Sequence, residues 1–268
     1  MFMNYILAYA TGYDKETYLP LLNSIKNIEN RSNIKLILFT DLDSSAFNEY
    51  DFIEVVNTED VNYKPIKYDV ISAVIRYFYY LNYLKQLDNS KNIDSVSFID
   101  VRDVVFQNLN LYNNIDQNKI YIFKENNRYT FGNEGCHKTW FDSIGRNDFS
   151  DKFKDDTFYC SGIHIFGNLD LTIYYLNLFT EQCEIYRDYK YAINDQPIHN
   201  ILIYEKHLNE IELHRCESEL DERIFSMGLC LEEDYIIENK KLYYKHNNVY
   251  PSIIHQYDRR LGRTKDLL

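Results

Sequence analysis

The chain has no C-x-x-C pair, and its five cysteines are widely spaced and odd in number. Closely spaced cysteine pairs are typical of zinc and redox sites, and even sets are typical of secreted disulfide frameworks. We therefore predict a reduced, cytoplasmic chain without a zinc site. A G-x-S-x-G segment is also absent, so a serine nucleophile of the hydrolase type has no support.

Long apolar runs and positive charge are scarce as well. No stretch approaches the roughly 20 apolar residues of a membrane-spanning helix, and we expect no transmembrane segment. The start, MFMNYILAYATGYD, has no basic region before its short apolar run, so it predicts a first core strand rather than a signal peptide. With 29 Lys and Arg against 41 Asp and Glu, the net charge is −12. An acidic chain repels phosphate backbones, so nucleic acid is not an expected partner, and nucleotide binding would need a metal ion or a local group of arginines.

The first part of the chain alternates between strand and helix patterns. Apolar strand patterns cover residues 4–10, 34–40, 52–56 and 95–106, and helical spacing covers residues 16–29 and 68–87. Such alternation predicts a mainly parallel sheet with helices on both faces. Ligands of such sheets bind beyond the carboxyl ends of the strands, where Thr11, Asp41 and the acidic segment 100–103 are expected.

The second part is less regular. We expect strands at residues 119–125, 158–166, 241–245 and 252–255, helices at 169–186 and 195–204, and mostly loop with a short helix near Trp140 over residues 128–156. No repeat, low-complexity segment or linker interrupts the chain. The prediction is one α/β domain over residues 1–268.

One strand pattern, SFIDVRDVVFQ at residues 97–107, is interrupted by Asp100, Arg102 and Asp103. Burying charge costs several kcal/mol unless the charge is paired or bound to a metal. Two carboxylates could hold Mg²⁺ or Mn²⁺, provided that the chain turns directly after Asp100, because residues three apart in a straight strand point to opposite faces. The alternative is an acidic strand end with an Asp–Arg pair, and the motif alone favours neither.

Further segments are ILAYATGYD, YCSGIHIFG, NDQPIHN and IIHQYDR. Together with SFIDVRDVVFQ, they resemble metal-dependent nucleotide-sugar glycosyltransferases of the GT-A fold. They also resemble a set of bacterial and viral members with D-x-R-D-V-x-F-Q, D-Q-x-x-H-N and H-Q-Y-D-R segments, and the resemblance runs from residue 5 to residue 259. It implies a single Rossmann-like domain, in which residues 1–107 bind the nucleotide and residues 108–268 bind the acceptor and complete the metal site.

The resemblance also implies a set of site residues. Mn²⁺ or Mg²⁺ would be held by Asp100, Asp103 and His255. The implied donor-binding residues are Ala8, Tyr9, Ala10, Thr11, Arg76, Asp100, Val101, Arg102, Ser161, Gly162, Asp195, Gln196 and Arg259. Asp195 and Gln196 would lie near the anomeric carbon as candidate catalytic residues. The resemblance favours a retaining reaction over an inverting one, in which Asp195 would be the base.

Each of these assignments has a structural alternative. His255 could be a core histidine, Arg76 could lie on a solvated helix face, and Asn194 or Asp195 ahead of Pro197 suits a helix N-cap. The loops near Lys119 and over residues 128–140 could form part of the acceptor site. Aromatic residues there could stack on an acceptor sugar or belong to a satellite core; these are Tyr129, Phe131 and Trp140.

The chain departs from its relatives in two places. Cys160-Ser161-Gly162 stands where some have Asn-x-Gly, and Leu261 stands near a position where others have a diphosphate-binding Lys. The basic residues that could replace that Lys are Arg259, Arg260, Arg263 and Lys265.

The expected activity is transfer of a sugar from a nucleotide sugar, with UDP as the expected nucleotide, to a glycan or other hydroxyl acceptor. Two alternatives are open: a metal-dependent phosphohydrolase, which the missing hydroxyl residue after the acidic motif disfavours, and an inactive nucleotide-sugar binding module.

Overall fold

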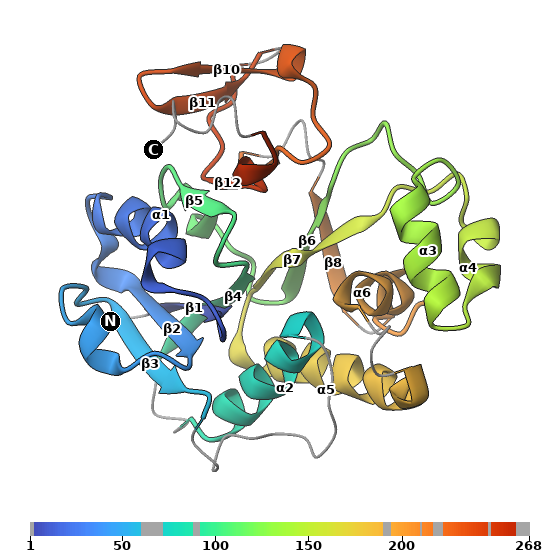
Figure 1. Ribbon diagram of the computed structural model, residues 1–268, viewed down its shortest axis with the longest axis horizontal. Helices are drawn as coiled ribbons and strands as arrows, with labels where there is room; N and C mark the ends of the chain where they lie inside the picture. The colour runs from blue at the N-terminus through green and yellow to red at the C-terminus, as the bar shows by residue number, and fades with distance from the viewer. Residues whose placement is uncertain are drawn as a thin grey trace.

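The central sheet of the computed structural model has seven strands. The structure describes residues 3–59, 72–87, 92–189, 194–209, 211–216, 222–245 and 248–260. In spatial order the strands are β3 (Ile53–Asn57), β2 (Ile34–Thr40), β1 (Met3–Tyr9), β4 (Ile93–Ile99), β7 (Tyr159–Phe166), β6 (Lys119–Lys124) and β8 (Glu212–Cys216). Neighbouring strands pair in parallel except β7, which is antiparallel to both β4 and β6. The prediction of a mainly parallel sheet is confirmed (Figure 1).

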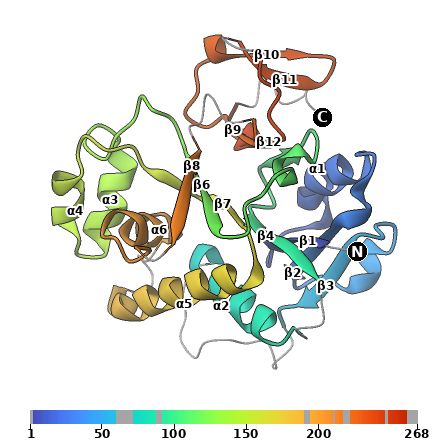
Figure 2. The same ribbon diagram turned by 180° about the vertical axis from the view of Figure 1, so that it is seen from behind.

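Helices cover both faces of this sheet, as predicted (Figures 1 and 2). One face packs against α1 (Lys15–Lys26). The other packs against α2 (Ser72–Lys85), α5 (Leu169–Ile185) and α6 (Asp195–Tyr204). Because successive strand residues point to opposite faces, Tyr5 and Leu7 of β1 join the α2 side while Ile6 and Ala8 join the α1 side.

Two small sheets complete the fold. One is ordered β5 (Val104–Phe106), β12 (Ile253–His255) and β9 (Ile224–Ser226), and the other is the pair β10 (Tyr235–Glu238) and β11 (Lys241–Tyr244). Strand β12 runs antiparallel to β5, with His255 opposite Val104. This pairing brings the late part of the chain back to the end of β4.

Several predicted boundaries were wrong. The single strand expected over residues 95–106 is two strands in different sheets, since the chain bends over residues 101–103, where Arg102 is exposed. The short helix expected near Trp140 is present as α3 (Gly135–Ser143), but α4 (Asn147–Lys152) was not predicted, so the segment 128–156 contains less loop than expected. Strands β8, β9 and β10 were not predicted. The first residues of the helix expected over 68–87 lie outside the described residues.

Two predictions from composition can be compared with the structure. None of the five cysteines forms a disulfide bond in the described part of the chain. Among the described residues, no helix combines the length and the apolar run needed to cross a bilayer.

Two fully buried histidines lie between β7, α5 and α6. His164 Nε2 is 3.0 Å from His199 Nδ1, which is 2.8 Å from the Tyr175 hydroxyl. Burial lowers the pKa of His199 to about 3 and the pKa of His164 well below its ordinary value. Both rings are therefore neutral in the folded protein at neutral pH.

This pair predicts that acid destabilises the fold. In the unfolded chain these histidines take up a proton at about pH 6.5, whereas in the folded protein they stay neutral. The free energy of unfolding should therefore fall by up to about 1.4 kcal/mol for each unit of decreasing pH and each histidine. The stability that comes from keeping His199 neutral is fully present above the pKa of an unfolded histidine. It is lost as the pH falls towards the pKa of His199 in the folded protein, about 3. Urea unfolding at several pH values should show a shallower pH dependence for His199→Gln than for the wild type. Equal slopes would contradict the prediction.

Candidate functional site

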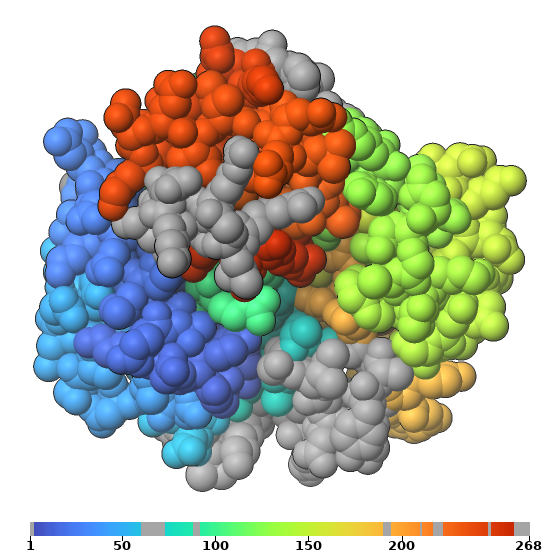
Figure 3. Space-filling view, turned by 45° about the horizontal axis from the view of Figure 1, so that its top comes forward, coloured from blue at the N-terminus to red at the C-terminus, as the bar shows by residue number. Residues whose placement is uncertain are grey.

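A cavity of about 430 Å³ opens beyond the carboxyl ends of β1 and β4. The N-terminal, central and C-terminal parts of the chain meet on this side of the molecule (Figure 3). Most of the predicted site residues line the cavity: Tyr9, Thr11, Arg76, Asp100, Val101, Arg102, Asp103, Ser161, Gly162, Asp195, Gln196, His255 and Arg259. The structure thus brings together segments that are far apart in the sequence.

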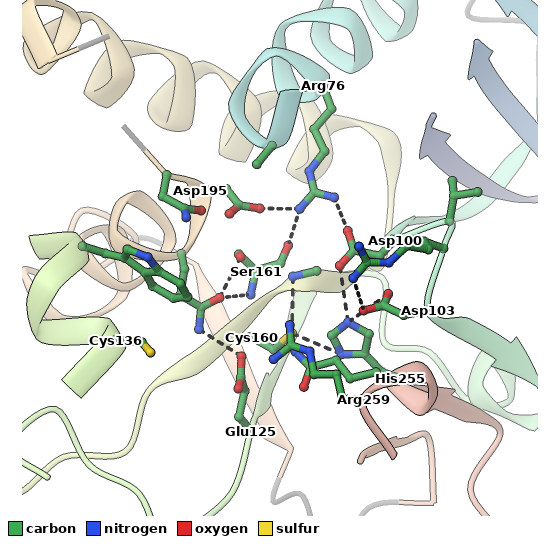
Figure 4. Close-up of a pocket in the computed structure, with 18 of the residues that line it drawn as sticks. Arg76, Asp100, Asp103, Glu125, Cys136, Cys160, Ser161, Asp195, His255 and Arg259 are labelled. Carbon is green, nitrogen blue, oxygen red and sulfur yellow. Dashed lines mark hydrogen bonds and ion pairs between the residues drawn. The ribbon is translucent and has the colours of Figure 1, made fainter. Parts of the chain in front are cut away.

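Asp100, Asp103 and His255 converge at one point of this cavity. Asp100 directly follows β4, Asp103 follows the bend, and His255 ends β12. One ligand atom from each residue lies within 4.8 Å of the other two, and His255 Nε2 is 3.3 Å from Asp100 Oδ2 and 3.8 Å from Asp103 Oδ1. The turn after Asp100 that the metal interpretation requires is present, and it allows this convergence (Figure 4).

The charges of this cluster are unevenly compensated. Burial raises the pKa of Asp100, but Arg76 and His255 outweigh that effect and hold it below its usual range. Burial raises the pKa of Asp103, and the neighbouring Asp100 adds to the increase. Burial lowers the pKa of His255, but Cys160 and both carboxylates raise it well above its ordinary value. A divalent cation would compensate the two adjacent carboxylates more closely than Arg102, whose Nη2 is 4.0 Å from Asp103 Oδ2.

The residues present fit a divalent metal. Two carboxylates and one imidazole are a suitable donor set for Mn²⁺ or Mg²⁺. Gly162 of β7 leaves space beside them, because a Cβ there would overlap Asp100 Oδ2 and lie 3.0 Å from His255 Nε2. The other ring nitrogen of His255 is 3.6 Å from Cys160 Sγ. Such a contact on the far side of a ligating histidine orients its ring.

Arg76 connects two carboxylates. Its side chain leaves α2, is buried, and pairs through Nη1 with Asp100 and through Nη2 with Asp195 (Figure 4). Nη2 also donates to the Ser161 carbonyl at 3.4 Å. The alternative that Arg76 lies on a solvated helix face is therefore wrong.

Asp195 and Gln196 are the first two residues of α6. Asn194 occupies the N-cap position, but its side chain makes no capping hydrogen bond. Burial raises the pKa of Asp195, and the opposing effect of Arg76 does not cancel it. Gln196 Oε1 accepts hydrogen bonds from the Ser161 N–H at 2.8 Å and the Ser161 hydroxyl at 2.7 Å. Both side chains are thus fixed on the cavity wall.

Successive side chains at the end of β1 point to opposite faces of the sheet. Tyr9 and Thr11 line the cavity, and the Thr11 hydroxyl lies 2.8 Å from that of Thr58. Ala8 and Ala10 are fully buried on the α1 side and do not line the cavity. They offer no exposed surface to a ligand, which corrects the expectation that all four residues from Ala8 to Thr11 bind the donor.

Two arginines lie at the cavity mouth. Arg102 is exposed and its Nε is 3.1 Å from an Asp258 carboxylate oxygen. Arg259 is exposed as well and lines the cavity. Leu261, Arg263 and Lys265 lie outside the described residues.

One side of the cavity is lined by polar residues that were not named from the sequence, although residues 128–140 were expected to form part of the acceptor site. Glu125, Glu134, Cys136 and His137 line it together with Trp140. Of the aromatic residues proposed for acceptor stacking, Trp140 lines the cavity. Phe131 is buried in the hydrophobic core, and the partly buried Tyr129 packs against that core. The spacing of Glu134 and His137, three residues apart at the start of a helix, was the only local signal for this side.

Comparisons with known proteins show a likeness in fold. No family model matches the chain, and no curated protein matches its sequence. The galactosyltransferase LgtC, solved with donor and acceptor sugar analogues, matches with a TM-score of 0.55 and 13% identity over 94% of this chain and 86% of LgtC. The glycosyltransferase GlyE of Streptococcus pneumoniae TIGR4 matches with a TM-score of 0.51 and 13% identity over 100% of this chain and 61% of GlyE. The bifunctional glycosyltransferase WbbM matches with a TM-score of 0.53 and 15% identity over 94% of this chain and 45% of WbbM. The chain spans less than two thirds of GlyE and WbbM, and it has the mainly parallel α/β fold of these GT-A glycosyltransferases.

Proposed function

We propose that the protein is a glycosyltransferase that moves a sugar from a UDP-sugar to a hydroxyl group of a glycan, with Mn²⁺ or Mg²⁺ at the diphosphate. The observation that carries the proposal is the convergence of Asp100, Asp103 and His255 beside the space left by Gly162. This cluster lies at the strand ends of a fold shared with solved glycosyltransferases, one of which holds donor and acceptor sugar analogues. The nucleotide-binding role of residues 1–107 and the acceptor-binding role of residues 108–268 belong to the same proposal.

The chain's own residues supply three functions in this reaction. Asp100, Asp103 and His255 would hold the metal, which when bound stabilises the negative charge on the leaving diphosphate. Arg76 holds the carboxylates of Asp100 and Asp195 in place. Arg259 adds positive charge at the mouth, where an anionic donor enters.

We propose that transfer proceeds with retention, with Asp195 and Gln196 beside the anomeric carbon. An inverting enzyme needs a carboxylate that is free to take the proton of the acceptor hydroxyl. Asp195 instead pairs with Arg76 at Oδ2. The phosphohydrolase alternative has no support among the structural neighbours reported above.

Thermal unfolding with a panel of nucleotide sugars tests this proposal. We expect UDP-sugars to raise the melting temperature only when Mn²⁺ or Mg²⁺ is present, because a ligand that binds the folded state alone stabilises it. Asp103→Ala should remove the metal-dependent shift. If no nucleotide sugar shifts the transition with either metal, the cluster is a structural ion-pair group and the proposal fails.

A further inference from the structure

We propose that Glu134 and His137 are positioning residues, which fix the side-chain amide of Gln196 and thereby set the rate of sugar transfer. The inference rests on the proposed function and names two residues beyond the predicted site. Neither is assigned to contact the donor or the metal.

The orientation of the Gln196 amide is determined by its neighbours. The Ser161 backbone N–H can only donate, so the amide atom 2.8 Å away from it is the oxygen, Oε1. The nitrogen, Nε2, therefore faces the other way. It lies 2.9 Å from the Tyr159 carbonyl, 3.2 Å from Glu125 Oε1 and 3.3 Å from His137 Nε2. Its two hydrogens are shared among three acceptors.

This arrangement also determines the tautomer of His137. An amide nitrogen cannot accept a hydrogen bond, so His137 Nε2 must be the acceptor and the ring proton must be on Nδ1. Nδ1 is 2.6 Å from Glu134 Oε2, to which it donates. The same oxygen accepts the backbone N–H of His137 at 2.9 Å, since Glu134 caps the N-terminus of α3. Glu134 thus orients the His137 ring and also caps α3, the helix to which His137 belongs.

Packing holds the ring in this orientation. His137 is 4% exposed and stacks on Phe158 with 3.5 Å between ring centroids, while Trp140 meets its edge at 5.0 Å. If packing between these aromatic rings were the only role of residue 137, an apolar ring would serve as well and would avoid the cost of burying a polar group. Here the polar ring and its carboxylate line the cavity together with Gln196. A continuous series of hydrogen bonds therefore runs from Glu134 to Ser161 along the cavity wall, and it preorganises Gln196.

The test compares two variants of His137. His137→Phe keeps an aromatic ring on Phe158 but removes the acceptor, and His137→Gln places an amide oxygen near the position of Nε2. We expect His137→Phe to lower kcat by about 10- to 100-fold, the size of effect that small misplacements produce, with the KM for the UDP-sugar within about twofold of wild type. His137→Gln should recover most of the lost kcat. In a Gln196→Ala background, His137→Phe should cause little further loss, because both changes act through one amide.

Circular dichroism and thermal unfolding of each variant are the controls that test whether it is folded. A wild-type kcat in His137→Phe would overturn the positioning role, and so would equal losses of kcat in His137→Phe and His137→Gln. Wild-type protein that transfers no sugar from any nucleotide sugar would overturn the proposed function itself, which separates the two failures.

Discussion

Replacing Asp103 with asparagine is expected to abolish metal-dependent sugar transfer while leaving the fold intact. Asp103 is buried beside Asp100, and its carboxylate lies 3.8 Å from His255 Nε2. An amide is a weak ligand for Mn²⁺ or Mg²⁺, and the charge stabilisation supplied by a metal is worth several kcal/mol. We therefore expect kcat to fall by about a thousandfold or more.

The same variant should be at least as stable as the wild type without metal. Burial and the like charge of Asp100 raise the pKa of Asp103, so its ionised form is unfavourable there and an uncharged amide relieves that cost. Thermal unfolding in chelator and Mn²⁺ binding by calorimetry measure the two effects separately. Glu49→Gln, which changes a surface carboxylate paired with Lys15 and Lys26, is the control. Wild-type turnover or Mn²⁺ affinity in Asp103→Asn would contradict the metal assignment.

Replacing Arg76 with methionine is expected to have the largest effect on stability. The buried guanidinium is shared by Asp100 and Asp195, and removing one partner of a buried ion pair costs about 3–5 kcal/mol because charge is left uncompensated. Activity should be lost as well, since both carboxylates belong to the proposed donor site. Arg76→Lys keeps the charge but cannot form two separate pairs through one planar group, so it should recover only part of the stability.

Urea unfolding of a double variant identifies the cause of this loss. Asp195→Asn added to Arg76→Met should restore part of the stability, because one of the two uncompensated carboxylates is removed. The unfolding free energies of the wild type, both single variants and the double variant are compared. If the losses caused by Arg76→Met and Asp195→Asn simply add in the double variant, the two side chains do not interact as described. An unfolding free energy of Arg76→Met equal to that of the wild type would rule out the ion pair.

Much of the fold follows from local patterns. The alternating strands and helices predicted a mainly parallel sheet covered on both faces, because strand and helix periods decide which residues can be buried together. The same alternation separates Tyr9 and Thr11, which face the cavity, from Ala8 and Ala10, which face α1. The period-two rule could have made that distinction from the sequence alone. The bend after Asp100 was also predictable, since charged side chains cannot continue a buried strand without partners.

The partners of those charges could not be read from the sequence. Arg102 approaches Asp103 within the acidic motif, with 4.0 Å between Nη2 and a carboxylate oxygen. Its shorter pair is with Asp258, and Asp100 pairs with Arg76 from α2. Neither partner is a neighbour in the chain, so the choice depends on how α2 and the C-terminal segment pack around the sheet. The Glu134–His137 pair was missed for the same reason, because tertiary packing places it on the cavity wall and in contact with Gln196 of α6.

The sequence by itself determined most of the helices and central strands, the class of fold and the residue types that a metal-dependent sugar transferase would need. Tertiary structure decided which of those residues meet. Pairing of β12 with β5 places His255 beside the two aspartates, and the missing side chain of Gly162 leaves room next to them. Local patterns specify backbone conformation and burial over a few residues, whereas a site built from distant strands depends on long-range packing, which no local pattern encodes.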